Sequence, residues 1–228
     1  MRWVALPARV LAVTGFLAVS VAAQPCPASA QQDARALVSR ASIAYRGLQS
    51  LRADFDQLIQ NPMIGDQPSK GMLIQSGQAR LAMRFSEPEG EAIVIDGEYI
   101  WVYTPSTTPG QVLRMPLPSG GPVYGYNLIA WLLDKPHERY QSTFVRNDRV
   151  EGRNVSVVEM IPTVPDMPFT RAVVWLDRTD GLPRRIEIEE TNGQQRTLTL
   201  RNLRVNVPIR DDTFRFQVPS GVKVIQQG

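Results

Sequence analysis

The hydrophobic positions change their spacing twice along the chain, and each spacing predicts a different element. Residues 10–23 form an almost unbroken apolar run. Between Asp33 and Gln60, apolar residues recur every three to four positions, which is typical of one face of an amphipathic helix. From Leu81 onward, apolar and polar residues alternate, which is typical of strands with one buried face. The pattern therefore predicts a terminal apolar segment, one long helix and a β-rich body.

The predicted helix over residues 33–60 ends at Asn61-Pro62, because proline lacks an N–H group and restricts the residue before it. A second, short helix is expected over Asn127–Leu133. The expected strands cover residues 80–85, 91–95, 98–103, 150–161, 171–177, 184–190, 197–207 and 214–218. Eight or more strands with short connections predict an α+β fold, mainly antiparallel, with helices on one side of the sheet.

Asp-Gly and Asn-Gly pairs between strands predict tight turns, because both pairs favour the backbone of β-hairpins. A two-residue turn at Asp96-Gly97 would place Ile93 opposite Ile100 and Ala92 opposite Trp101. Both faces of this hairpin are then apolar, so each face requires a covering layer. Further turns are expected at Asp180-Gly181 and at Asn192-Gly193.

The first thirty residues have the features of a secretory signal peptide. Arg2 and Arg9 precede the apolar run, and Ala28-Ser29-Ala30 follows it as a small-x-small cleavage site. As a helix, the run would reach about 21 Å, which is short of the ~30 Å hydrocarbon core of a membrane. We expect residues 1–30 to be removed after Ala30, leaving a single domain over residues 31–228 in the periplasm.

The only cysteine, Cys26, lies near that cleavage site and could instead carry lipid. A bacterial lipobox requires an aliphatic residue three positions before the cysteine and a small residue directly before it. Here Ala23 and Pro25 stand at those positions, so the match is poor. We expect Cys26 to be discarded with the signal, and a lipidated Cys26 is the alternative.

Charge excludes one class of function. Removal of residues 1–30 takes away two arginines, so that 25 basic side chains become 23 against 22 acidic ones. The basic residues are scattered along the chain, which gives no basis for nucleic-acid binding. We expect a monomer that binds no nucleic acid.

Enzyme signatures are also missing. The one histidine, His137, lies in a segment that we interpret as a loop, and the sequence holds neither a Gly-x-Ser-x-Gly motif nor a P-loop. One histidine without a retained cysteine cannot supply the usual zinc ligands. Glu187, Glu189 and Glu190 beside Arg184 are interpreted as a solvated strand face. We expect no enzyme, metal or cofactor, although a hydrolase with paired carboxylates is an alternative.

Apolar residues exceed what one packed face of a sheet requires. Met83, Phe85, Tyr99 and Trp101 lie on strands whose opposite faces are also apolar. An ordinary core under helices would explain them, and so would a curved sheet enclosing a ligand cavity. Composition does not separate these two explanations.

Six segments, in order along the chain, resemble the periplasmic lipoprotein carriers of the LolA family. The segment Leu51–Gln57 resembles the ending of that family's first helix, and Gly71-x-Leu73 its next strand. The remaining segments are Leu81–Pro88, which is similar to "rfrw-x-y-x-x-P", Asp96–Pro105, similar to "DGk-x-lW-x-Y-x-P", Asp180–Ile186, similar to "tGlP-x-ri", and Phe214–Val222, similar to "F-x-f-x-vP-x-Gv".

The resemblance implies an incomplete, unclosed β-barrel covered by a helical lid. Such carriers take lipoproteins from an ATP-driven release complex of the inner membrane and deliver them to an acceptor lipoprotein of the outer membrane. The acyl chains of the lipoprotein would lie in an apolar cavity. Together, the resemblance, the hairpin pairing and the apolar excess name the expected lining: Leu81, Met83, Phe85, Ile93, Ile100 and Trp101.

The chain departs from the family pattern at Gly77, where the better-studied carriers have an arginine that holds the lid closed. Two other functions share this fold. An outer-membrane acceptor lipoprotein would require a lipidated Cys26, and a lipid-sensing regulatory domain usually continues into a further domain, whereas this sequence ends at Gly228.

Overall fold

The structure is a computed structural model that describes residues 27–119 and 122–227, with the backbone alone for residues 27–32. The predicted signal segment up to Cys26 lies outside the described residues. The helices are α1 (Pro27–Arg46), α2 (Leu128–Leu133), α3 (Pro136–Arg139) and the 3₁₀ turn η1 (Asp211–Phe214). The strands are β1 (Ser50–Asn61), β2 (Gly65–Ser76), β3 (Arg80–Glu87), β4 (Ala92–Ile95), β5 (Tyr99–Tyr103), β6 (Gln111–Pro116), β7 (Tyr140–Val150), β8 (Arg153–Pro162), β9 (Phe169–Asp177), β10 (Pro183–Glu190), β11 (Gln195–Val205) and β12 (Lys223–Gln226).

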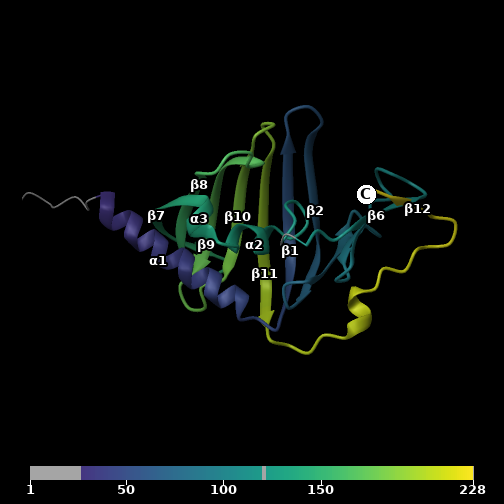
Figure 1. The fold of residues 1–228 in the computed structure, drawn as a ribbon, viewed down its shortest axis with the longest axis horizontal. Helices are drawn as coiled ribbons and strands as arrows, with labels where there is room; N and C mark the ends of the chain where they lie inside the picture. The colour runs from purple at the N-terminus through teal and green to yellow at the C-terminus, as the bar shows by residue number, and fades with distance from the viewer. Residues whose placement is uncertain (1–26, 120–121, 228) are drawn as a thin grey trace, which may run out of the picture.

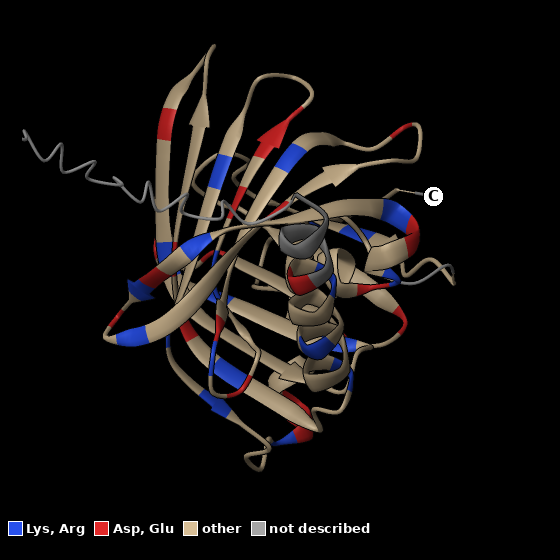
Figure 2. Cartoon of the chain, turned by 90° about the vertical axis from the view of Figure 1, so that its left-hand side faces the viewer, with Lys and Arg blue, Asp and Glu red and all other residues tan. Residues whose placement is uncertain are grey.

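All twelve described strands form one sheet in the order β12-β6-β5-β4-β3-β2-β1-β11-β10-β9-β8-β7. β12 joins β6 in parallel, and the other neighbouring strands are antiparallel. The sheet curves around the helices, with α1 crossing one side of the opening (Figures 1 and 2). Within the described residues β7 and β12 do not pair, so the sheet stays open. The predicted α+β fold, an unclosed barrel covered by helices, is confirmed.

The first helix is shorter than predicted, and the prediction over residues 48–60 is wrong. α1 ends at Arg46, and residues 50–61 form β1, which pairs along its length with β2 and β11. The side chains of Leu51, Ala53 and Phe55 are buried between more exposed neighbours, which is the period-two pattern of a strand. Hydrophobic spacing fits both periods here, and pairing with two neighbouring strands decides in favour of the strand.

The Asp96-Gly97 hairpin forms with a different register. Ile95 pairs with Ile100 and Ile93 with Val102, so the connection is longer than two residues. The Asp96 carboxylate accepts hydrogen bonds from the backbone N–H groups of Glu98 and Tyr99, at 2.8 and 2.7 Å, and these bonds stabilise the wider turn. The predicted pairing of Ile93 with Ile100 is wrong, but a shift of two residues keeps these two side chains on the same face of the sheet.

The carboxyl-terminal segment also differs from the prediction. Residues 214–218 were expected as a strand, whereas η1 and an extended segment precede the short strand β12. Phe214 and Phe216 pack against Ala82, Val94 and Trp101 on the outer face of β3–β5. This segment, yellow in Figure 1, is the cover that the outer apolar face requires.

The main core lies on the inner face of the sheet. α1 contributes Ala34, Val38, Ala41 and Tyr45, and α2 contributes most of its apolar side chains. α1 packs chiefly on β7 and also contacts β8 and α2. α1 therefore covers the β7–β8 side of the inner face, α2 packs farther along it against Phe169 of β9, and the β3–β6 side lies beyond both helices (Figure 1).

Candidate functional site

The inner faces of β3, β4 and β5 carry five of the six side chains predicted to line a cavity. Leu81, Met83 and Ile100 are buried, while Phe85 and Ile93 are partly exposed. All five belong to one apolar cluster together with Ile95, Val102 and Met115. Alternation along each strand brings them to this face, because every second side chain points the same way.

Trp101 does not join this set. It is adjacent to Ile100 in β5 and therefore points to the opposite face of the sheet. Its indole N–H donates a hydrogen bond of 2.8 Å to Asp96, and its ring stacks on Phe216 with 5.5 Å between ring centres. The guanidinium of Arg114 lies 5.4 Å from the centre of the ring. Trp101 thus anchors the carboxyl-terminal segment on the outer face.

A pocket of about 520 Å³ opens at one end of the inner face. Such a volume is within the range of about 300–1,000 Å³ that is usual for small-molecule sites. Its lining is mainly apolar and comes from β5, β6, the segment up to α2 and the chain end: Ile100, Met115, Pro116, Pro118, Val123, Tyr126 and Gln227. Among the predicted lining residues, Ile100 alone borders this pocket. Sequence reasoning missed Met115 because it did not predict β6.

Two aromatic rings and one glycine shape the inner face beside β3. Phe55 on β1 and Phe85 on β3 flank Gly71 of β2, and their rings meet edge to face at 5.1 Å. A Cβ atom on Gly71 would lie 2.1 Å from the carbonyl oxygen of Arg84, so no other residue fits without displacing the backbone. This crowding explains why the Gly71-x-Leu73 motif requires glycine at position 71.

A buried polar network joins α1, β2 and α2 inside the apolar core. The Tyr45 hydroxyl donates to Gln75 Oε1 at 2.6 Å and lies 3.3 Å from Asn127 Oδ1. Asn127 also caps α2 by accepting from the N–H of Ala130, and Gln75 Nε2 donates to the carbonyl of Gly77 at 2.6 Å. Burial raises the pKa of the Tyr45 hydroxyl, which therefore stays protonated and serves as a donor.

A second polar cluster contains the Glu190–Arg196 ion pair. Glu190 accepts a hydrogen bond from the Tyr124 hydroxyl at 3.0 Å and lies 3.4 Å from Arg196 Nη2. The side chain of Glu190 is only 10% exposed, so the expectation of a solvated face is wrong for this residue. Burial raises the pKa of Tyr124, and the negative charge of Glu190 raises it further.

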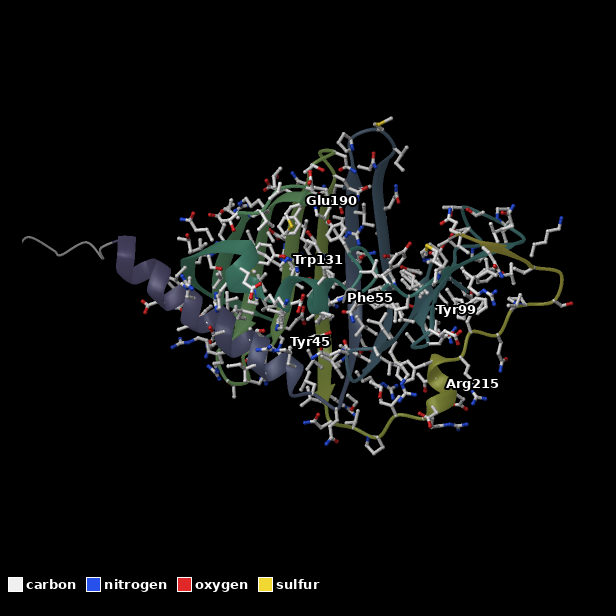
Figure 3. The ribbon with its side chains drawn as sticks, in the orientation of Figure 1. Tyr45, Phe55, Tyr99, Trp131, Glu190 and Arg215 are labelled. Atoms are coloured by element: carbon white, nitrogen blue, oxygen red, sulfur yellow. The ribbon has the colours of Figure 1, made fainter. Side chains whose placement is uncertain are left out.

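Aromatic rings below this cluster pack α2 onto the sheet. The Trp131 ring lies 4.9 Å from that of Tyr124 and 5.6 Å from that of Phe169, and Arg139 lies 3.9 Å above it. Figure 3 shows Trp131, Tyr45 and Phe55 along the interior, with Glu190 near its upper end. Sequence reasoning predicted α2 but gave Trp131 no role, because only tertiary contacts bring these rings together.

His137 lies in α3 rather than in a loop, so that expectation is wrong. Its Nε2 atom is 2.6 Å from Ser39 Oγ, which links α3 to α1. Burial and the nearby charge of Arg35 lower its pKa, so the imidazole is neutral at pH 7. Across residues 27–119 and 122–227, no cluster of three or more potential metal ligands occurs, and no helix there is long and apolar enough to cross a bilayer.

The fold and this inner face define a class of protein: an open antiparallel sheet wrapped around helices, with a mainly apolar pocket at the mouth. The profile of the family described as "Outer membrane lipoprotein carrier protein LolA" matches residues 46–217. The chain belongs to this family.

Individual relatives agree with this assignment. The chain is 28% identical over 223 residues to the outer-membrane lipoprotein carrier protein of Alkalilimnicola ehrlichii, covering 96% of each chain. Among solved structures, an uncharacterized conserved protein from Thermus thermophilus matches with a TM-score of 0.56 at 12% identity, over 86% of this chain and 100% of that one. MucB matches with a TM-score of 0.51 at 18% identity, over 85% of this chain and 66% of that one. At these identities, the two structures support the fold alone.

Proposed function

We propose that the protein is a periplasmic chaperone that carries lipoproteins from the inner to the outer membrane by sheltering their acyl chains. The observation that carries this proposal is the continuous apolar inner face, with partly exposed side chains beside an open pocket. Membership of the carrier family supports the same conclusion.

The chemistry of the inner face suits an acyl chain. Transfer of hydrocarbon out of water is worth about 0.8 kcal/mol per buried methylene, so an acylated protein does not cross an aqueous space unaided. Methionine and branched aliphatic side chains provide adaptable, non-directional contact. Partly exposed residues at the open side, Phe85, Ile93, Val102 and Met115, would meet the acyl chain first. Leu81 and Met83, which are buried, would be reached only after the face opens.

The proposal includes the route. The protein would take cargo from an ATP-driven release complex in the inner membrane and hand it to an acceptor lipoprotein in the outer membrane. It would reach the periplasm after cleavage at Ala30. Mass spectrometry of the protein isolated from cells would test this, because cleavage at Ala30 leaves Gln31 as the first residue, whereas a diacylated Cys26 would favour the acceptor lipoprotein instead.

A solution binding assay tests the carrier proposal directly. The protein is mixed with a fluorescent peptide that carries a diacylated amino-terminal cysteine, and with the same peptide without acyl chains. We expect binding of the acylated peptide alone. Equal binding of both peptides, or of neither, contradicts the proposal.

A pair of glutamate variants locates the binding face. Met115→Glu places a charge at the pocket and should weaken binding of the acylated peptide at least tenfold, because a carboxylate does not tolerate contact with hydrocarbon. Val145→Glu is the matched control, since Val145 is exposed on the edge strand β7. It should bind like the unaltered protein. Thermal unfolding of both variants checks that the fold persists.

A further inference from the structure

The β1–β2 hairpin extends well beyond β3 on one side, while β11 accompanies it on the other side up to Gln60 opposite Gln195. β1 and β2 pair without a break up to Asn61 opposite Gly65, whereas β3 ends its pairing with β2 at Lys70. Five further residues of β2 thus run about 16 Å past the last contact with β3, at 3.3 Å per residue. The hairpin is the highest point of the molecule in Figure 1.

Two apolar side chains occupy the tip of this hairpin. Met63 is 91% exposed and Ile64 is 71% exposed, the highest values among large apolar residues of the described chain. The turn that presents them is braced, because Asn61 Oδ1 accepts hydrogen bonds from the N–H groups of both residues, at 2.9 and 3.3 Å. Asn61 Nδ2 in turn donates to Gln194 on the neighbouring hairpin at 3.2 Å.

The hairpin is also poor in charge. From Gln57 to Ser69 the only charged residue is Asp66, whereas charged residues make up 21% of the whole chain. A charged side chain is costly inside a bilayer, so a nearly uncharged segment with an apolar end suits entry into lipid. The charged groups behind it include Glu87, which pairs with Lys70 at 2.8 Å, and the exposed Glu89, at the end of β3 nearest the hairpin. Together with Asp66, these groups carry no excess of positive charge that would attract an anionic surface, which favours a neutral one.

The free edge of the hairpin is protected against pairing with another strand. Beyond Lys70, the outer side of β2 has no neighbour among the described strands. Pro68 lacks an N–H donor, and Asp66 adds a charge at this edge. Both features disfavour strand addition by a peptide or by a second copy of the chain. We therefore expect the hairpin to make contacts through the side chains at its tip.

We propose that Met63 and Ile64 enter the interfacial layer of a lipid bilayer with neutral headgroups, and that the hairpin is a membrane-contact element. This inference extends the proposed function, because a carrier meets a membrane at each end of its route. It does not depend on cargo, so the vesicle experiment below omits cargo. Its failure would leave the carrier proposal standing.

A fluorescent label at the tip tests the contact. All variants carry Cys26→Ser, since Cys26 is the only cysteine of the chain, and all are purified from the periplasmic fraction. Met63→Cys is labelled with an environment-sensitive dye and mixed with phosphatidylcholine vesicles. Ile43→Cys is the matched control, because Ile43 is 64% exposed on α1, away from the hairpin. We expect enhanced fluorescence, quenched by spin-labelled lipid, at position 63 alone.

A flotation assay with unlabelled protein gives the magnitude. Met63→Ser combined with Ile64→Ser should lower vesicle partitioning at least about tenfold, because burial of each side chain favours transfer from water. Ile43→Ser should leave partitioning unchanged, and the double variant should still bind the acylated peptide in solution. No signal at position 63, equal signals at positions 63 and 43, or binding to anionic vesicles only would overturn the proposal. A tip that acts solely on a protein receptor would give the first of these results.

Discussion

The hydroxyl of Tyr45 donates a hydrogen bond of 2.6 Å to Gln75 Oε1, and this bond fastens α1 to β2 within the apolar core. Gln75 Nε2 in turn donates a hydrogen bond to the carbonyl of Gly77. Gly77 is the residue at which the family resemblance predicts an arginine. Neutral groups therefore join the helix to the sheet at this point. They require no buried charge, and each member has a partner.

The Tyr45 network should contribute measurably to stability. Tyr45→Phe should lower the free energy of unfolding by about 1–3 kcal/mol, because it removes the donor to the buried Gln75 Oε1. Gln75→Leu should also destabilise, and the double variant should cost less than the sum of the two. Urea denaturation of all four proteins measures this coupling. Tyr103→Phe, at a partly exposed tyrosine, is the control and should change stability by less than about 0.5 kcal/mol. Additive effects would show that the bond contributes little.

Substitution of Trp101 should affect stability but not binding, whereas substitution of its strand neighbour Val102 should affect binding, because the two residues face opposite sides of β5. Trp101→Leu should destabilise the fold by about 1–3 kcal/mol through lost packing on Phe216, yet leave acylated-peptide binding unchanged. Val102→Glu should weaken that binding. Peptide titration followed by thermal unfolding separates the two effects. If a folded Trp101→Leu protein lost binding, Trp101 would have to contribute to the cavity, and its assignment to the outer face would be contradicted.

Gly71→Ala should be unusually costly for a change of one methyl group. The added Cβ would lie 2.1 Å from the Arg84 carbonyl oxygen and 2.8 Å from the Cα atom of Phe85, both backbone atoms that cannot rotate away. We expect a loss of about 3 kcal/mol in the free energy of unfolding. Gly47→Ala is the control, because its Cβ would meet nothing closer than 3.5 Å. It should be neutral or stabilising by up to about 1 kcal/mol.

Acid should weaken the fold through Asp177. Burial of this carboxylate raises its pKa, but hydrogen bonds from Arg153 and the Thr179 backbone, with the charge of Arg184, outweigh burial and hold the pKa at about 2. A pKa below the unfolded value of about 3.9 stabilises the fold above pH 4, and this contribution is lost as pH falls from about 4 to 2. The lowered pKa corresponds to about 2–3 kcal/mol.

Asp177→Asn tests this acid dependence. At pH 7 the variant should be less stable by about 3 kcal/mol, because Arg184 remains buried with one partner fewer. Denaturation at a series of pH values should show the difference shrinking between pH 4 and pH 2. Asp211→Asn, at an exposed pair with Arg80, is the control and should follow the unaltered protein. A constant difference across this pH range would contradict the assignment.

The amino-acid sequence by itself determined the faces of the strands. Alternation at Leu81, Met83 and Phe85 placed three side chains on one face of β3, and this holds whatever the register, because the period of a strand is two residues. Even the wrong turn at Asp96-Gly97 kept Ile93 and Ile100 on the same face, since the register moved by two. The family motifs, the antiparallel fold and the need for a cover on both faces were predictable for the same local reasons.

Tertiary structure decided what local spacing leaves ambiguous. The segment from Leu51 to Ile59 fits a helix or a strand, and it became β1 because β2 and β11 satisfy its backbone hydrogen bonds on both sides. Trp101 lies on the face opposite Ile100 because side chains alternate along β5, but only the tertiary structure shows that Phe216, distant in sequence, covers its ring there. The Tyr45–Gln75 bond and the exposed tip of the β1–β2 hairpin likewise depend on which strands lie side by side. Strand order is a long-range property, and hydrophobic periodicity carries only short-range information.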